Sequence, residues 1–381
     1  MTAATAAASY AASDDCRFMD AALALGRREL GRTWPNPAVG AVVVRDERDG
    51  PVIVGRGWTQ AGGRPHAETE ALRRAGDTAR GATLYVSLEP CAHHGKTPPC
   101  ADAIIAASVR RVVSAMDDPN PEVAGRGHAR LRAAGIAVEV GLGAAEARRA
   151  HAGHIRRMRD GRPHVTLKLA ISADSKAGLA GRRPVAISGA EAQARVHMLR
   201  AQSDAVLIGI GTALADDPLL TCRLPGMAER SPVRVVLDTH LRLPPGGKLA
   251  GGAREVPVWV VAGVDAPAAN EQALRESGVE VLRAGVREDR IDLPAALRRL
   301  ADKGITRLMV EGGPITAAAF LDANVVDEAM LLRGPNTLGA DAIDALEGLP
   351  LSALTASQRL VSRGIEPMGA DTIETFERRD A

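Results

Sequence analysis

Three short stretches give the strongest signal in this sequence: His66-Ala67-Glu68, Pro90-Cys91 and Pro98-Pro99-Cys100. One imidazole and two thiolates offer three ligands that suit Zn²⁺, so a bound ion would keep its fourth position for water. Such an open position is typical of a catalytic zinc, because a structural zinc is enclosed by four protein ligands. We expect Glu68 to lie over the metal without binding it, and to move a proton between the bound water and a leaving nitrogen.

The order of these residues is also informative. His-x-Glu followed by Pro-Cys and a further cysteine is the signature of zinc enzymes that deaminate nucleobases and nucleosides. Taken singly, a His-x-Glu usually lies on a solvated helix face, and isolated cysteines are usually small buried hydrophobic residues. Eight residues separate Cys91 from Cys100, where most deaminases have two. The basic loop between them, with His93 and His94, either shapes a pocket for an anionic substrate or is a plain surface loop.

The pattern around these stretches predicts an α/β arrangement. Short apolar runs at 38–44 and 52–57 flank a turn-rich segment and predict a β-hairpin. Residues 65–75 are expected to form a helix that begins with a proline and ends before a glycine, and residues 83–88 read as a buried strand. A second helix is expected to begin at Cys100, where free N–H groups would favour the thiolate form of the cysteines.

Composition restricts the class of protein. A chain of 381 residues exceeds the size at which one hydrophobic core usually suffices, so two domains are expected. Lysine and arginine number 48 against 46 acidic residues, and aromatics make up 2%, so we expect neither nucleic-acid nor membrane binding. Four cysteines fit a reducing cytoplasm better than a disulfide framework. Residues 1–13 are rich in Ala, Ser and Thr and are expected to form a disordered tail.

The second half of the chain also alternates between strand and helix signals. Apolar runs that read as strands lie at 164–170, 205–209, 233–237, 256–261, 279–282 and 307–310. A helix is expected to begin at Ser188-Gly189-Ala190-Glu191, which matches a capping box, and another to span 293–303. The Rossmann fingerprint is absent, because Gly209-Ile210-Gly211-Thr212 matches it only in part. Glu311-Gly312-Gly313-Pro314, between a strand and a helix, is suited to bind a pyrophosphate through free backbone N–H groups.

Both halves of the chain carry further motifs. In the first half they are Pro35-Asn36-Pro37, Leu88-Glu89-Pro90-Cys91 with Pro98-Pro99-Cys100, and Asp118-Pro119-Asn120-Pro121 followed by Gly125-Arg126-Gly127. In the second half they are Leu167-Lys168-Leu169-Ala170, Leu199-Arg200-Ala201-Gln202-Ser203, Leu214-Ala215-Asp216-Asp217-Pro218 and Glu311-Gly312-Gly313-Pro314. Together these motifs resemble the bifunctional riboflavin-biosynthesis proteins of the RibD family, over nearly the whole chain.

The resemblance implies a fold and two activities. It predicts a cytidine-deaminase-like α/β/α domain over residues 14–155 and a dihydrofolate-reductase-like α/β domain over 156–381. The first domain would use Zn²⁺ to release ammonia from 2,5-diamino-6-(5-phosphoribosylamino)pyrimidin-4(3H)-one. The second would use NADPH to reduce the ribosyl group of 5-amino-6-(5-phosphoribosylamino)uracil to ribityl. The implied partner is a small phosphorylated pyrimidine, and a homo-oligomer is one option for the assembly.

Site residues are carried over position by position from this resemblance. His66, Cys91 and Cys100 are the expected zinc ligands, and Glu68 is the expected catalytic residue. The positions that would bind NADPH are Ala170, Ala186, Thr212, Asp216, Thr239, Gly313, Pro314, Ile315, Thr316, Ala317, Ala318 and Ala319. The positions that would bind substrate are Asn36, Lys168, Pro184, Arg200, Leu220, Arg223 and Glu311. For Asn36, a hydrogen bond to substrate and a turn role between two prolines stay equally open.

The chain departs from the family pattern at two places. It reads Ser172-Ala173-Asp174-Ser175-Lys176 where the family often has glycine at the fourth position, and Pro184-Val185-Ala186-Ile187 where it often has Ser-x-Trp-Ile. One alternative is therefore a deaminase whose second domain binds NADP without reducing anything. A deaminase that edits nucleic acid is disfavoured by the near-neutral, aromatic-poor composition. A binding module with a structural zinc is disfavoured by Glu68 and by the presence of only three evident ligands.

Overall fold

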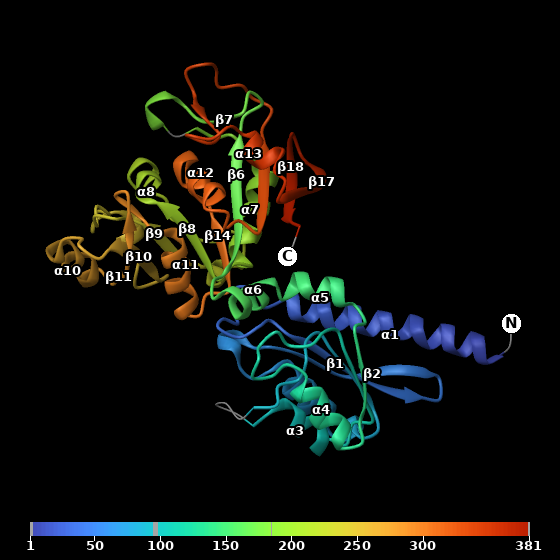
Figure 1. Cartoon of the computed structure of the whole chain (residues 1–381). Coiled ribbons are helices and arrows are strands. Elements are labelled where there is room, and N and C mark those ends of the chain that lie inside the picture. Colours follow the sequence, from blue (N-terminus) through green and yellow to red (C-terminus); the bar gives the residue numbers. More distant parts are fainter. Residues whose placement is uncertain (1–2, 94–97, 184, 380–381) are drawn as a thin grey trace. The chain divides into compact units, whose positions relative to one another are not determined.

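The computed structural model describes residues 3–93, 98–183 and 185–379, and divides the chain into two compact units between Asp160 and Gly161 (Figure 1). The sequence predicts this division at 155/156, which falls inside the helix that ends at Asp160. Each unit has a sheet and hydrophobic clusters of its own. Among the described residues, no helix combines the length and the apolar character that crossing a membrane requires.

The first unit is built on a five-stranded sheet with the order β2-β1-β3-β4-β5. Its strands are β1 (Gly40–Glu47), β2 (Gly50–Trp58), β3 (Thr83–Val86), β4 (Arg111–Ser114) and β5 (Ala137–Val140). Its α-helices are α1 (Ala3–Arg27), α2 (Ala67–Ala75), α3 (Cys100–Ala106), α4 (Arg126–Ala133), α5 (Ala144–Ala150) and α6 (Ala152–Asp160). The predicted hairpin is confirmed, because β1 pairs with β2 in antiparallel register. Strand β1 also pairs antiparallel with β3, and β3, β4 and β5 are parallel.

Alternation along β1 places helices on both faces of this sheet. Ala41 and Val43 belong to a core shared with α2, α3 and α4, whereas Val42 and Val44 pack with α1 and α5. Successive strand side chains point to opposite faces, so the fully apolar run of β1 requires cover on each side. The result is the predicted three-layer α/β/α unit.

Helix α1 differs from the expectation for the N-terminus. It begins at Ala3 and therefore includes most of the segment 1–13 that the sequence predicts as a disordered tail. Alanine has the highest intrinsic helix propensity, and this segment leads without a break into a helix that is anchored by the buried residues Phe18, Met19 and Leu23.

The second unit contains a nine-stranded sheet with the order β11-β10-β9-β8-β14-β6-β15-β18-β17. Its strands are β6 (His164–Ile171), β8 (Ala205–Gly209), β9 (Val233–Leu237), β10 (Val258–Gly263), β11 (Glu280–Ala284), β14 (Arg307–Val310), β15 (Glu328–Arg333), β17 (Leu360–Met368) and β18 (Asp371–Arg378). The α-helices are α7 (Ala190–Ala201), α8 (Ile210–Asp216), α9 (Lys248–Gly251), α10 (Ala268–Glu276), α11 (Leu293–Asp302), α12 (Pro314–Asp322) and α13 (Ser352–Thr355). Two short pairs join β7 (Lys176–Gly178) to β16 (Ile343–Asp344) and β12 (Val286–Arg287) to β13 (Arg290–Ile291).

Seven neighbouring strands of this sheet, from β11 to β15, are parallel, and β18 and β17 complete it as antiparallel strands. All six strands predicted in this half are present. The capping box predicted at Ser188 is wrong in detail: Gly189 is the N-cap residue of α7, without a side-chain cap of its own. Instead, the distant Asp371 carboxylate accepts a hydrogen bond from the Gly189 N–H at 2.6 Å.

Candidate active sites

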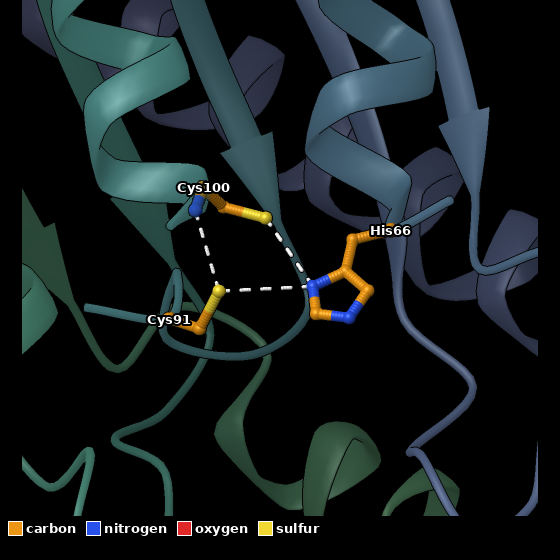
Figure 2. A group of neighbouring side chains, drawn as sticks. All are labelled: His66, Cys91 and Cys100. Carbon is orange, nitrogen blue, oxygen red and sulfur yellow. Dashed lines mark hydrogen bonds between the residues drawn. The ribbon is translucent and has the colours of Figure 1, made fainter. Parts of the chain in front are cut away.

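Three side chains from three separate segments converge in the first unit (Figure 2). His66 is the N-cap residue of α2, Cys91 lies in the loop after β3, and Cys100 is the first residue of α3. The His66 Nδ1 atom lies 3.3 Å from the Cys100 sulfur and 3.7 Å from the Cys91 sulfur. Tetrahedral zinc, with bonds of about 2.3 Å to sulfur and 2.0–2.1 Å to nitrogen, separates these atoms by about 3.6 Å. The donor set and its spacing therefore fit Zn²⁺.

The N-terminus of α3 prepares one thiolate for a metal. The Cys100 backbone N–H donates a hydrogen bond to the Cys91 sulfur at 3.3 Å (Figure 2). Hydrogen bonds from the Cys100 thiol, from His66 and from this backbone N–H lower the pKa of Cys91 to about 4, against the opposing effect of burial. A deprotonated sulfur at neutral pH is what zinc ligation requires.

Glu68 lies one residue inside α2 and its side chain is almost fully buried. Burial raises the pKa of Glu68 to about 7, while the charge of the nearby His66 acts in the opposite direction. A carboxyl group with such a pKa can both take up and return a proton near neutral pH. The carboxyl group interacts with all three ligand residues, and the proton-shuttle role expected from the sequence stays a prediction.

A buried carboxylate, Glu89, supports the loop that carries Cys91. Its two oxygens accept four backbone hydrogen bonds, from Asp118 at 3.0 Å, Gly125 at 2.9 Å, Gly127 at 2.9 Å and His128 at 3.2 Å. A Cβ atom on Gly127 would lie 1.9 Å from the carbonyl oxygen of Pro90, so only glycine permits this close packing. Glu89 and Gly127 stand in the family motifs without a predicted role, although a carboxylate directly before Pro90-Cys91 is a signal that the sequence contains.

Asn36 has a local partner in the structure. Its side-chain amide donates to the Gly63 carbonyl at 2.8 Å, and the Thr33 hydroxyl donates to the Asn36 carbonyl at 3.0 Å. These bonds support the turn role, and they also fix the amide in one orientation, so the substrate role stays a prediction. Of the two loop histidines, His93 is exposed, and His94 lies outside the described residues.

The second unit has a cavity of about 360 Å³ at the carboxyl ends of the parallel strands β6, β8 and β14. Ligands of open α/β sheets bind at this edge. Eight of the predicted site residues line the cavity: Lys168, Ala170, Ala186, Thr212, Asp216, Glu311, Gly313 and Pro314. The strands that contribute them lie far apart in the sequence, and the sheet order brings them together.

The other predicted residues that the structure describes do not line this cavity. Thr239 follows β9, two strands away from β14, and Ile315 is exposed on α12. The remaining predicted positions of that helix are Thr316, Ala317, Ala318 and Ala319, of which Ala317 and Ala318 are buried. Arg200 is buried and pairs with the cavity residue Glu311, Leu220 is buried in a hydrophobic core cluster, and Arg223 is exposed. Pro184 lies outside the described residues.

The cavity edge suits the pyrophosphate of a nicotinamide cofactor. Gly313 is the N-cap residue of the nine-residue helix α12, whose first turn offers N–H groups without intrahelical partners. The backbone passes closely there: a Cβ atom on Gly312 would lie 2.5 Å from the Thr316 Cβ, and one on Gly209 2.5 Å from the Thr316 hydroxyl. The Gly313 N–H also donates to the Thr212 hydroxyl at 3.1 Å. These residues therefore fit NADPH.

Three charged side chains meet beside the cavity. Arg200 donates to both carboxylate oxygens of Glu311, at 2.5 and 2.9 Å. Burial alone would raise the pKa of Glu311, but the charge and hydrogen bonds of Arg200 hold it below its ordinary value. Burial lowers the pKa of Lys168, and the nearby Glu311 charge opposes this. The cavity thus presents an ionised carboxylate close to a lysine.

This chain has Ser175 at the position where the family often has glycine. Ser175 adopts a φ of +62°, in the left-handed region that favours glycine. Asp174 stabilises this turn by accepting hydrogen bonds from the Leu338 and Gly339 N–H groups and from the Ser172 hydroxyl. The turn conformation is therefore kept without the glycine.

Comparisons with known proteins agree with both sites. Residues 12–116 match the family model of the cytidine and deoxycytidylate deaminase zinc-binding region, and residues 163–373 match that of the RibD C-terminal domain. The riboflavin biosynthesis protein RibD of Escherichia coli (strain K12) is 42% identical over 338 residues, which are 85% of this chain and 89% of that protein. That of Aquifex aeolicus is 38% identical over 366 residues, which are 96% and 98% of the two chains.

Solved structures give the same result. Acinetobacter baumannii RibD superposes with a TM-score of 0.84 and 36% identity, covering 96% of this chain and 99% of that one. The deaminase/reductase of Thermotoga maritima gives a TM-score of 0.81 and 33% identity, covering 96% and 98%. With a zinc-ligand cluster in one unit and a cofactor cavity in the other, this chain belongs to the RibD family of riboflavin biosynthesis proteins.

Proposed function

We propose that this protein carries out two consecutive steps on one phosphorylated pyrimidine. The first unit would deaminate 2,5-diamino-6-(5-phosphoribosylamino)pyrimidin-4(3H)-one. The second would reduce the ribosyl group of 5-amino-6-(5-phosphoribosylamino)uracil to ribityl. The observation that carries the proposal is the His66–Cys91–Cys100 cluster with the buried Glu68 beside it, because this donor set leaves room for a reacting water.

In the deaminase unit, Glu68 performs the proton transfers. His66, Cys91 and Cys100 would hold Zn²⁺, which when bound would supply a water with a pKa lowered to about 7 as the nucleophile. The Glu68 carboxylate takes the proton of that water and returns it to the departing amino nitrogen, so that ammonia leaves and a carbonyl remains. Burial of Glu68 keeps other water away from this proton. Asn36, held by Gly63, would orient the pyrimidine ring or the ribose.

In the reductase unit, the cavity residues orient the phosphoribosyl group. NADPH supplies a hydride for the ribosyl C1 when it is bound. Gly313 and the first turn of α12 would hold its pyrophosphate, with Thr212 and Asp216 on the neighbouring helix. Lys168 can donate a hydrogen bond or a proton to the ring oxygen as the sugar opens, and Glu311 lies close enough to influence its charge. The exposed Arg223 is suited to the substrate phosphate.

The test is a coupled assay on purified, zinc-loaded protein with the diaminopyrimidine substrate and NADPH. Ammonia release and NADPH oxidation are followed separately, and the deaminated intermediate is supplied in a second series. With the diaminopyrimidine substrate, ammonia release is expected first and NADPH oxidation second. Ammonia without NADPH oxidation in either series would favour a second unit that binds NADP without reducing anything. The cytoplasmic location, the homo-oligomer and the absence of nucleic-acid and membrane partners stay predictions.

A further inference from the structure

One face of helix α7 contacts both the cavity residue Glu311 and the loop at residues 219–223. Arg200 and His197 are three residues apart, so their side chains leave the same face of the helix. Arg200 binds the Glu311 carboxylate with its Nε and Nη2 atoms and donates from Nη1 to the Thr221 carbonyl at 3.1 Å. His197 Nδ1 accepts a hydrogen bond from the Arg223 N–H at 3.3 Å. The helix thus connects the cavity carboxylate to the loop at residues 219–223.

This loop is held by its backbone at several further points. A second buried arginine, Arg234, donates to the Leu219 carbonyl at 3.3 Å and also binds the carbonyls of Gly252 and Val256. The Cys222 N–H donates to the Ser231 hydroxyl at 3.1 Å. Within the loop, Leu220 has a φ of +54°, a conformation that persists only when its surroundings determine it.

Protein groups therefore engage three of the five N–H donors of Arg200. Its side chain is 11% exposed and that of Glu311 is 7% exposed, so the pair is largely removed from water. Removing one member of such a pair leaves the other as an uncompensated buried charge. A lysine could keep the charge, but it lacks the planar fork that binds two carboxylate oxygens and a carbonyl at once.

We infer that Arg200 is a positioning residue that fixes the Glu311 carboxylate and the 219–223 loop in one arrangement for the phosphoribosyl substrate. This inference rests on the proposed reductase function. Arg200 would act in two ways. Its positive charge keeps Glu311 ionised, and the planar guanidinium holds the loop that carries Leu220 and Arg223 in place. A residue that merely contacted the substrate phosphate would have neither effect.

The charged groups that face Glu311 determine the sign of the pH effect. They are Lys168 from β6 and His197 and Arg200 from α7. All three favour the ionised carboxylate, and Arg200 does so most strongly. Without the arginine, burial would raise the pKa of Glu311. As the pH falls, activity that needs the ionised carboxylate would then be lost at a higher pH than in the unaltered protein. The pKa values of Lys168 and His197 would rise as well, because Arg200 lowers both.

The experiment compares Arg200→Gln, Arg200→Lys and the matched control Arg195→Gln, which removes an exposed arginine from the same helix. NADPH oxidation with the deaminated substrate is measured from about pH 5 to 10. Arg200→Gln should move the acid limb of kcat upward by about 1 to 3 pH units. Arg200→Lys should leave this limb in place and raise the substrate KM by about tenfold, because the fork is lost. The control should match the unaltered protein.

A readout independent of activity is the titration of the Glu311 carboxyl carbon by NMR, assigned through its loss in Glu311→Gln. Its midpoint should rise in Arg200→Gln and stay in place in Arg200→Lys. For Arg200→Gln, an unmoved midpoint, or a KM increase without a shift of the kcat profile of that variant, would overturn the inference in favour of a simple substrate contact. If the unaltered protein oxidises no NADPH while the midpoint still moves, the proposed function fails and the positioning role stands.

Discussion

Replacing Glu89 with glutamine should weaken the deaminase unit at its zinc loop. The carboxylate is buried and accepts four backbone hydrogen bonds between 2.9 and 3.2 Å. A glutamine of the same shape offers one oxygen, which can keep two of these bonds. Its NH₂ group would face the other two N–H donors, so two donors would lose their acceptor.

The expected loss follows from these two donors. A buried donor without a partner costs about 1–3 kcal/mol, which gives about 2–6 kcal/mol for the pair. Gly125 is exposed, and water can replace its bond, whereas Asp118, Gly127 and His128 are buried. The lower half of that range, about 2–4 kcal/mol, is therefore expected. Since Gly127 packs against Pro90, the displacement should reach the neighbouring Cys91 and weaken zinc binding.

The assay uses the distribution of tryptophans. The chain has three, at positions 34, 58 and 259, so a Trp259→Phe background restricts fluorescence to the deaminase unit. Urea denaturation in this background gives the free energy of unfolding of that unit, and zinc content is measured after dialysis. Glu122→Gln is the control, because Glu122 is exposed on the β4–α4 loop whose N–H groups bind Glu89. Equal midpoints and full zinc in Glu89→Gln and the control would refute the reasoning.

Three further predictions concern the two sites separately. Glu68→Gln should lower ammonia release by about 10²–10⁴-fold while zinc content and NADPH oxidation with the deaminated substrate stay unchanged; loss of zinc would show a structural role instead. Gly312→Ala places a Cβ atom 2.5 Å from the Thr316 Cβ and should raise the KM for NADPH, whereas Gly285→Ala, with no heavy atom near its Cβ, should leave it unchanged. Ser175→Gly relieves a φ of +62° and should stabilise the reductase unit against urea by about 0.5 kcal/mol, since the relief of about 1–2 kcal/mol exceeds the added chain entropy. A lower stability would mean that the hydrogen bond from Arg333 to the Ser175 hydroxyl outweighs the strain.

Local patterns predicted those parts of the fold that local chemistry determines. The β1–β2 hairpin, helix α2 and strands β6, β8, β9, β10, β11 and β14 follow from apolar runs, turns and caps, and the zinc ligands are predicted from residue type and order. Strand β15 was not among the predicted strands, because its residues Glu328–Arg333 include Ala, Met and Leu, which favour helices. Strands β17 and β18 carry mostly exposed or half-buried residues, so their apolar signal is weak.

The parts that escaped prediction depend on distant partners. Asp371 caps helix α7 from another element, which no reading of residues 188–191 can reveal. The reductase cavity unites β6 with β14, although most of the unit's sequence lies between them. Arg200 is predicted to bind substrate from its motif, and its ion pair with Glu311 spans 111 positions of the chain, so no local pattern reveals that pair.

The reductase cavity is lined by two kinds of residues: strand ends, which belong to the sheet, and loop residues, which do not. Its floor consists of strand ends inside a nine-stranded sheet, where any substitution would disturb neighbours on both sides. Its outer wall comes from the connection after β6, which contributes Ala186 to the lining and also contains the turn at Ser175. Substitutions in this connection leave the sheet intact. Changes in substrate or cofactor preference within such proteins should therefore accumulate in this connection, with the scaffold beneath it unaltered.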